Sequence, residues 1–285
     1  MQSQKKFTRS FSCEFFPPKT ELGMEKLHIT SQQLNEVIKP DYFSVTFGAG
    51  GSTRERTFEA VKQINQISGV DVAPHLSCIG STREQLLDVL DNYRQQGIRR
   101  IVTLRGDMPS GMVSAGEFNY ANELVSFIRQ QHGDHFKLEV AAYPEFHPQA
   151  ESASKDLANF KRKIEAGADS AITQYFYNID AYFRFVESCE QLGLEIPVMP
   201  GIMPITNFTN LSRFSEACGA EIPRWLRKRL QDYGDDIESI KAFGTDVVSD
   251  LCQRLLDAGA PGLHFYTLNQ AEATLKIWDR LSITR

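Results

Sequence analysis

The chain has 285 residues, of which 41% are hydrophobic, and a formal net charge of −5. This length allows one large α/β domain or two small ones, and the absence of a long basic run argues against nucleic acid as the main partner. Five scattered cysteines without a Cys-x-x-Cys pair argue against a disulfide framework or a structural zinc. There is no signal-peptide core and no apolar run long enough to span a membrane. We therefore expect a soluble, cytoplasmic protein without a membrane partner.

Short apolar runs and amphipathic helical patterns alternate along the chain. The expected strands cover residues 11–16, 41–47, 70–77, 101–104, 137–143, 170–175, 197–203 and 262–266. The seventh range contains Pro197 and Pro200 and is followed by Pro204, and prolines are unfavourable in a central strand. Ser81 and Glu84 have the spacing of a capping box at the start of the helix after the third strand. A long helical stretch, residues 207–258, is interrupted near Gly219 and Gly234.

The regular spacing of the strand ends predicts the fold class. The residues at these ends are Glu14, Thr46, His75, Arg105, Tyr143, Gln174, Met203 and Tyr266, separated by 32, 29, 30, 38, 31, 29 and 63 residues. Eight such units predict an α/β fold, a (β/α)8 TIM barrel, with an extra helical stretch between strands seven and eight. We expect residues 1–285 to form a single catalytic domain, with residues 1–9 as a flexible arm. The second interpretation is a doubly wound open sheet, but no Gly-x-Gly-x-x-Gly motif opens a helix after the first strand.

Two carboxylates at strand ends are the candidates for chemistry. Charges are costly to bury without a partner, and ligands of α/β folds bind at the carboxyl ends of the strands. Glu14 lies in an apolar segment, where desolvation would raise its pKa and suit it to act as a general acid. The alternative is a buried ion pair with an arginine or lysine of the barrel. Asp107 follows the fourth strand and would stabilise a cation or orient a ring, or else cap a helix or pair with Arg105.

The other polar residues near strand ends allow more than one interpretation. His75 and His147 would bind a metal together with the two carboxylates, as in a metal-dependent lyase or hydrolase. Without a His-x-His or His-Glu-x-x-His spacing, we expect hydrogen-bonding histidines and no metal. The helix after strand five carries a polar stripe that is either a solvated face or a grip for ribose and phosphate groups. The stripe consists of Asp156, Asn159, Arg162 and Lys163.

Nine short segments, in order along the chain, resemble the methylenetetrahydrofolate reductase family. They are Glu14-Phe-Phe-Pro-Pro18, Ser44-Val-Thr-Phe-Gly-Ala49, Ala73-Pro-His-Leu76, Leu104-Arg-Gly-Asp107, Ala141-Ala-Tyr-Pro-Glu145, Ile172-Thr-Gln174, Pro200-Gly-Ile202, Asn207-Phe208 and His264-Phe-Tyr-Thr-Leu-Asn269. The match covers nearly the whole chain. It is similar to the short bacterial form, without the carboxyl-terminal regulatory domain of the eukaryotic enzymes, and it implies a homo-oligomer.

The resemblance implies a barrel that binds FAD non-covalently. The flavin contacts of the family correspond to Thr46, His75, Arg105, Gly106, Asp107, Tyr120, Ala121, Tyr143, His147, Ala150, Asp156, Asn159, Arg162 and Lys163. Its folate contacts correspond to Glu14, Asp107, Gln174 and Phe208, the last of which would stack on the substrate. Gln270 stands where the family has an arginine, so one substrate or flavin contact there would lack its cation.

The resemblance also implies a reaction. NADH or NADPH would reduce FAD and leave, and methylenetetrahydrofolate would then accept the hydride in a ping-pong cycle. Glu14 would act as the general acid, Asp107 would stabilise the iminium cation and Gln174 would orient the pterin. The product, methyltetrahydrofolate, feeds methionine synthesis. Two other classes stay open, a metal-dependent barrel lyase or hydrolase and a non-catalytic flavin- or folate-binding protein.

Overall fold

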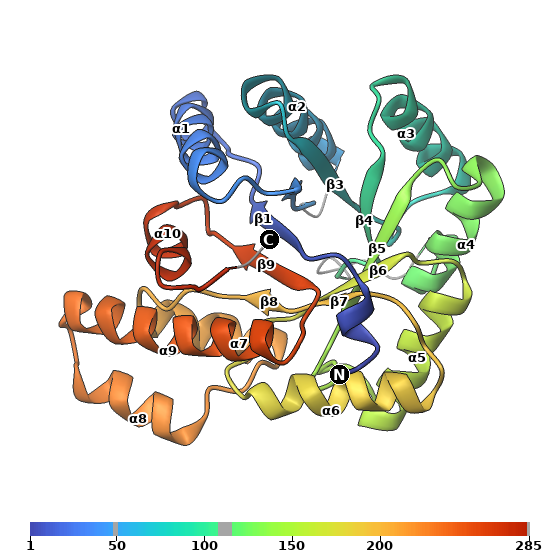
Figure 1. Ribbon diagram of the computed structural model, residues 1–285. Coiled ribbons are helices and arrows are strands. Elements are labelled where there is room, and N and C mark those ends of the chain that lie inside the picture. The colour runs from blue at the N-terminus through green and yellow to red at the C-terminus, as the bar shows by residue number, and fades with distance from the viewer. Residues whose placement is uncertain (48–50, 108–115, 284–285) are drawn as a thin grey trace.

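The chain folds into a barrel of parallel strands surrounded by helices (Figure 1). The computed structural model describes residues 1–47, 51–107 and 116–283. Within these ranges the strand order is β7-β6-β5-β4-β3-β2-β1-β9-β8, and every pairing is parallel. This arrangement confirms the predicted (β/α)8 barrel, and the alternative of an open doubly wound sheet was wrong.

The helices and strands lie close to their expected positions. The strands are β1 Ser10–Phe15, β2 Tyr42–Val45, β3 Asp71–Ser77, β4 Arg100–Leu104, β5 Lys137–Ala142, β6 Ser170–Thr173, β7 Val198–Met199, β8 Gly201–Ile202 and β9 Gly262–Tyr266. The helices are α1 Glu21–Val37, α2 Gly51–Ser68, α3 Arg83–Gln95, α4 Ala121–His132, α5 Ala153–Glu165, α6 Ile179–Gln191, α7 Phe208–Cys218, α8 Arg224–Asp232, α9 Ile237–Asp257 and α10 Glu272–Trp278. None of the helices in the described ranges is both long and apolar enough to cross a membrane.

The seventh strand position of the barrel is occupied by two short strands, β7 and β8, which the sequence did not predict. We expected one strand over residues 197–203, but β7 pairs with β6 and β8 pairs with β9, and Pro200 separates the two. Proline has no N–H to give to a neighbouring strand. Its carbonyl still accepts a hydrogen bond from the His264 N–H at 3.0 Å. The two halves therefore close the barrel between β6 and β9.

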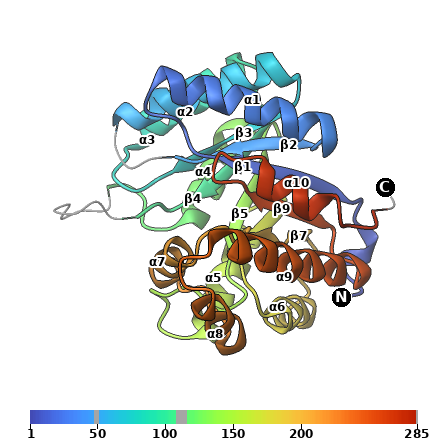
Figure 2. The ribbon, with the colours of Figure 1, turned by 90° about the vertical axis from the view of Figure 1, so that its left-hand side faces the viewer.

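Three helices, α7, α8 and α9, form the long connection between β8 and β9. The interruptions expected near Gly219 and Gly234 are the ends of α7 and α8, where both glycines have positive φ. Such a backbone suits glycine, which has no Cβ to clash. In Figure 2, α7, α8 and α9 lie with α6 on one side of the barrel, and α1 to α3 lie on the other.

The capping box of α3 is shifted by one residue from its predicted place. The Thr82 side chain accepts a hydrogen bond from the Gln85 N–H, and the Gln85 side chain accepts one from the Thr82 N–H. Ser81 and Glu84, which we predicted, have the same spacing one position earlier. Pattern alone did not distinguish the two registers.

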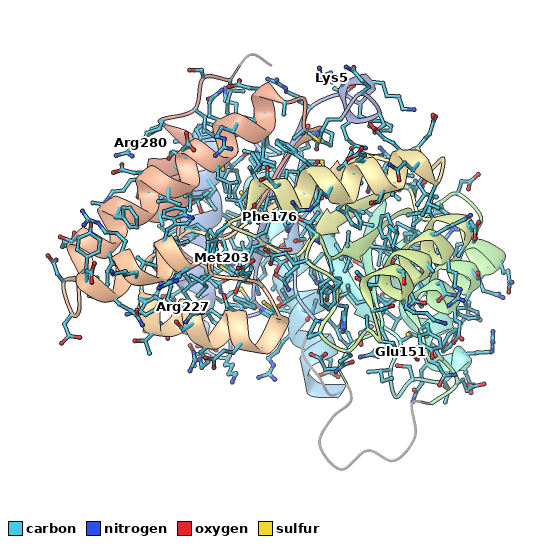
Figure 3. The ribbon with its side chains drawn as sticks, turned by 90° about the horizontal axis from the view of Figure 1, so that it is seen from below. Lys5, Glu151, Phe176, Met203, Arg227 and Arg280 are labelled. Carbon is cyan, nitrogen blue, oxygen red and sulfur yellow. The ribbon has the colours of Figure 1, made fainter. Side chains whose placement is uncertain are left out.

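Two sets of apolar side chains form the core. The larger set fills the layer between the strands and the helices. A small set, Tyr42, Ala73, Val102, Ile172 and Met199, comes from five different strands and packs together separately, as expected of the inside of a small barrel. Figure 3 shows Phe176 and Met203 toward the middle of the molecule, with Lys5, Glu151 and Arg280 toward the outside.

The amino-terminal residues contact the barrel, although we expected a flexible arm over residues 1–9. Gln4 to Lys6 form a short 3₁₀ helix. The buried Gln4 amide donates to the Ile196 carbonyl at 3.1 Å and accepts from the Val198 N–H at 2.8 Å. The Gln4 side chain thereby satisfies two backbone groups at the start of β7.

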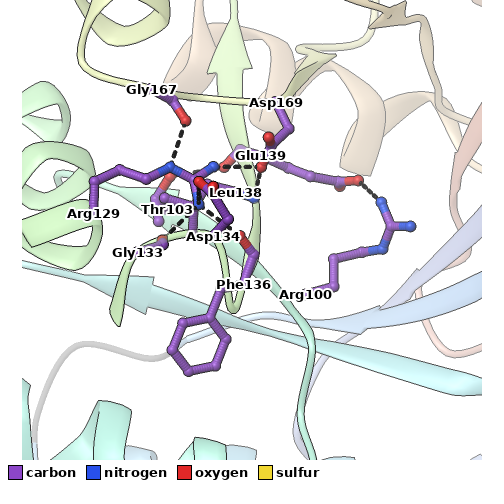
Figure 4. Close-up of polar contacts among 10 residues, drawn as sticks. All are labelled: Arg100, Thr103, Arg129, Gly133, Asp134, Phe136, Leu138, Glu139, Gly167 and Asp169. Atoms are coloured by element: carbon purple, nitrogen blue, oxygen red, sulfur yellow. Dashed lines mark hydrogen bonds and ion pairs between the residues drawn. The ribbon is translucent and has the colours of Figure 1, made fainter. Parts of the chain in front are cut away.

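A buried ionic cluster lies inside the barrel, at the Arg100–Glu139 pair of Figure 4. Arg100 contacts Glu139 Oε1 at 2.5 Å, and the Tyr42 hydroxyl donates to Oε2 at 2.6 Å. Burial alone would lower the pKa of Arg100, but the negative charge and hydrogen bond of Glu139, with smaller effects of Tyr42 and Asp71, outweigh burial and raise it. Glu139 is 1% exposed, so each group depends on the others for compensation.

Candidate active site

A cavity of about 430 Å³ opens at the carboxyl ends of the strands. Six residues that we predicted for the site line it, namely Glu14, Thr46, His75, Asp107, Tyr143 and Gln174. They lie near the carboxyl ends of six different strands, β1 to β6, or directly after them, so only closure of the barrel brings them together. In TIM barrels this end carries the active site.

Glu14 lies at the inner wall of this central cavity, between two histidines. Its Oε2 is 3.2 Å from His75 Nε2 and 3.3 Å from His264 Nε2. On its other side, the His264 ring uses Nδ1 to hydrogen-bond the Ser12 hydroxyl at 2.7 Å. Both His264 and Ser12 are fully buried. The side chains of β1, β3 and β9 thus form one polar cluster around a single carboxyl group.

The pKa of Glu14 is lowered, not raised as the sequence predicted. Burial by itself raises it, but charge and hydrogen-bond interactions with His75 and His264 outweigh burial and bring it to about 2. The alternative from the sequence, an ion pair with arginine or lysine, named the wrong partners. Glu14 is therefore ionised at neutral pH, and a proton donated at this position must be supplied by a neighbouring donor.

A second cavity of about 220 Å³ adjoins the first and shares Leu104, Asp107, Ala141 and Tyr143 with it. The residues that we predicted to bind the cofactor and that line this side cavity are Arg105, Gly106, Asp107, Ala121, Tyr143, His147 and Lys163. Asp107 lines both cavities, so its carboxylate lies where a ligand in one would meet a ligand in the other. Two cationic side chains give the side cavity the charge that a phosphate-bearing ligand needs.

The Lys163 ammonium group is held against the strands. Nζ donates to the Ala141 carbonyl at 2.5 Å. Burial lowers its pKa to about 8, although Asp156 acts in the opposite direction. Burial also lowers the pKa of His147, and it raises that of Tyr143 to about 12. A ligand with negative charge would offset the cost of enclosing Lys163.

Gly106 makes the turn that positions Asp107. Its φ is +86°, and a Cβ on it would lie 2.3 Å from the Ser77 hydroxyl oxygen. Only glycine fits here without displacing the end of β3. The neighbouring Arg105 side chain donates to the Gly106 carbonyl at 3.1 Å and to Gln149 Oε1 at 2.6 Å.

Several predicted site residues do not line either cavity. These are Tyr120, Ala150, Asp156, Asn159, Arg162, Phe208 and Gln270. Tyr120 is 58% exposed beside Ala121, and Asp156 accepts the His147 N–H at 2.9 Å. Asn159 and Arg162 are exposed and bond to each other at 2.8 Å. Tyr120 and Asp156 thus neighbour or contact residues that line the side cavity, and ligand contacts by any of the seven stay predictions.

Phe208 and Gln270, which we expected to contact the substrate, do not line the central cavity. Phe208 begins α7 and is partly buried against the core. Gln270 is exposed and lines a separate cavity of about 60 Å³ with Lys241 and Lys276. The aromatic residue that α7 contributes to the central cavity is Phe214.

The sequence analysis missed the residues that complete the cluster and the rim. His264 and Ser12 hold Glu14, and Phe16 and Leu268 line the mouth of the central cavity. His264 was within a segment used for the family resemblance, and a buried polar residue in a predicted strand was the signal available. No local pattern in the sequence marks Phe16 or Leu268 as rim residues.

The family model and the relatives described below all carry the same family name. The family model described as methylenetetrahydrofolate reductase matches residues 1–282. The chain is 40% identical over 273 residues to the 5,10-methylenetetrahydrofolate reductase of Pectobacterium carotovorum subsp. carotovorum, covering 95% of this chain and 90% of that protein. For the Escherichia coli (strain K12) protein of the same name, the identity is 39% over 272 residues, with coverages of 95% and 90%. An Arabidopsis thaliana methylenetetrahydrofolate reductase (NADH) 1 is 37% identical and is matched over 48% of its length.

Solved structures share the barrel at low sequence identity. A Clostridium thermocellum protein described as binding two copies of 5-methyl-5,6,7,8-tetrahydrofolic acid superposes with a TM-score of 0.62 at 17% identity, covering 98% of this chain and 96% of that one. An oxaloacetate acetylhydrolase superposes with a TM-score of 0.52 at 9% identity, with coverages of 98% and 82%. At these identities the likeness establishes the fold alone.

Proposed function

Because the chain belongs to the methylenetetrahydrofolate reductase family, we propose that it reduces methylenetetrahydrofolate to methyltetrahydrofolate with FAD and NADH or NADPH, in a ping-pong cycle. The observation that carries the proposal is that three predicted reactive residues line the same central cavity. Glu14, Asp107 and Gln174 come from three different strand ends, and all three line that cavity. These are an acid–base group, an anion and a hydrogen-bonding amide, which this reduction requires.

The residues around the side cavity fit a flavin dinucleotide. The side cavity continues into the central one, so a flat ring at their junction and a phosphate-bearing tail beside Arg105 and Lys163 suit its shape and charge. Arg105, Gly106, Ala121, Tyr143, His147 and Lys163 would hold the cofactor, with Thr46 and His75 toward its ring. FAD, when bound, would supply the hydride chemistry, accepting a hydride from the nicotinamide and returning it to the folate.

The cluster around Glu14 would deliver the proton that opens the five-membered ring of the substrate. Since the pKa of Glu14 is about 2, the carboxylate alone is a poor donor at neutral pH. His264, held by Ser12, and His75 both place Nε2 within 3.3 Å of Glu14 Oε2. We therefore assign the general acid to the cluster, with Glu14 as the group through which the proton reaches the substrate.

Gln174 and Asp107 would orient and stabilise the reacting ring. Gln174 Oε1 already accepts the Tyr175 N–H at 3.0 Å, which leaves the amide NH₂ to donate to a ligand. Asp107, fixed after the Gly106 turn, would face the cation that forms on ring opening. A carboxylate already in place stabilises that charge without reorganising during the reaction.

The proposed function is tested by the absorbance spectrum of the purified protein. We expect a flavin spectrum that bleaches when NADH or NADPH is added without oxygen, and that returns when methylenetetrahydrofolate follows. Comparing the two nucleotides establishes the preferred donor. A protein that stays colourless after incubation with FAD, or one whose reduced flavin is not reoxidised by the folate, would overturn the proposal.

Replacing the second carboxylate should separate the two half-reactions. We expect Asp107→Asn to slow reoxidation by methylenetetrahydrofolate roughly 100-fold, and reduction by NADH less than about threefold, because only the folate step develops a cation beside it. Rapid-mixing absorbance at the flavin band measures both rates. If both fell equally, Asp107 would act on the cofactor and not on the folate.

A further inference from the structure

An exposed aromatic ring stands at the mouth of the central cavity. Phe16 follows β1 and is 45% exposed, yet it lines the same cavity as Glu14, two residues earlier. Leu268, from the loop after β9, lines the cavity as well. An exposed phenylalanine that lines this cavity has a ring face available to pack against a flat ligand ring.

The side chain of Asn269 hydrogen-bonds both the N–H and the carbonyl of Phe16. The Phe16 N–H donates to Asn269 Oδ1 at 2.8 Å, and Asn269 Nδ2 donates to the Phe16 carbonyl at 2.9 Å. This pair of hydrogen bonds, to a residue 253 positions away, continues the β1–β9 pairing beyond the end of both strands. The Phe16 backbone therefore cannot turn away from the cavity without breaking both hydrogen bonds, and the backbone sets where the ring begins.

The loop that carries Asn269 is itself fixed and strained. The Thr267 hydroxyl donates to the Glu14 carbonyl at 2.6 Å and accepts the Asn269 N–H at 3.2 Å. Leu268 and Asn269 have φ values of 53° and 58°. This left-handed region is unfavourable for leucine, because its Cβ then lies too close to the backbone. Such strain persists where surrounding contacts fix it, and it turns Leu268 into the cavity wall.

We propose that Asn269 is a positioning residue that holds Phe16 as the outer wall of the substrate site, where the Phe16 ring packs against the aromatic ring of the folate beyond its pterin. This inference rests on the proposed function for the identity of the ligand. Phe16 contacts a part of the substrate that does not react, so its contribution is the same in the ground state and the transition state. Its loss therefore raises KM and leaves kcat unchanged.

The test is a double-mutant cycle on Phe16 and Asn269, read in two ways. The first reading is KM and kcat for methylenetetrahydrofolate, and the second is the Kd of methyltetrahydrofolate by titration calorimetry. We expect Phe16→Ala to raise KM and Kd about 10-fold with kcat within twofold, and Phe16→Tyr to restore both. Asn269→Ala should raise them about threefold. In the Phe16→Ala background, Asn269→Ala should add nothing, because Asn269 acts through Phe16.

Asn65→Ala is the matched control, since the Asn65 side chain also donates to a backbone carbonyl, that of Val70 at 3.0 Å, but it lies in α2 and bonds the segment before β3, and it lines neither cavity. It should leave KM and Kd unchanged. Thermal unfolding of each variant checks that it is folded. Wild-type affinity in Phe16→Ala, or additive losses in the double variant, would overturn the inference. If the wild-type protein bound no methyltetrahydrofolate and reduced no methylenetetrahydrofolate, the proposed function would fail instead.

Discussion

Glu14→Gln should abolish the folate half-reaction, at least 100-fold, while the protein still binds FAD and is reduced by NADH at close to the wild-type rate. General acid catalysis contributes typically 10²- to 10⁴-fold, and an amide cannot pass on a proton. Gln keeps the size of the side chain and can still accept from His264, so the cavity should persist. Rapid mixing of pre-reduced enzyme with methylenetetrahydrofolate measures the step in a single turnover.

The control for this experiment is Glu151→Gln, which removes one exposed carboxylate on the outside of the molecule (Figure 3). It should match the wild type in both half-reactions. Single-turnover folate reduction at the wild-type rate in Glu14→Gln would mean that the proton takes another route. Equal slowing of NADH oxidation would mean that the substitution disturbs the whole site.

Glu139→Gln should cost about 3 kcal/mol of unfolding free energy, although Glu139 touches neither cavity. The substitution leaves Arg100 charged inside the barrel without its counter-ion, and breaking a buried pair typically costs 3–5 kcal/mol. The Arg100 side chain is 18% exposed, which places the expected loss toward the lower end. Urea denaturation followed by circular dichroism measures the loss.

The matching surface substitution is Glu272→Gln, which removes the partner of Lys276 at 2.7 Å on exposed α10. Exposed pairs contribute little, so we expect no measurable change in the free energy of unfolding. If Glu139→Gln also left the free energy of unfolding unchanged, water would reach Arg100 easily and the cluster would not be a buried pair.

The fold was predictable because its signals are local and repeated. Apolar runs followed by amphipathic helices at spacings near 30 residues indicate a barrel, since each unit must bury a strand on both faces. The failures were local as well. Pro200 divides the expected seventh strand into β7 and β8. Two capping patterns one residue apart, beginning at Ser81 and at Thr82, could not be distinguished by sequence.

The candidate site was predictable only in part. The sequence pointed to Glu14, Asp107 and Gln174 through their strand ends and the family resemblance, and the structure brings all three to one cavity. It did not predict the protonation state of Glu14, because the pKa depends on His75 and His264, which are 61 and 250 residues away in the chain. For the same reason it missed the Phe16–Asn269 clamp, which joins the segments that follow the first and the last strand of the chain, β1 and β9.

The sequence by itself determined the alternation of strands and helices, the turn at Gly106 and the residue types available at each strand end. These depend on backbone sterics and on the period of apolar residues, which act within a few positions along the chain. Only the tertiary structure decided which of those residues share a cavity, how their charges shift one another and which surface residues form its mouth. Such interactions fall off over a few ångströms in space, and barrel closure sets those distances between residues far apart in sequence.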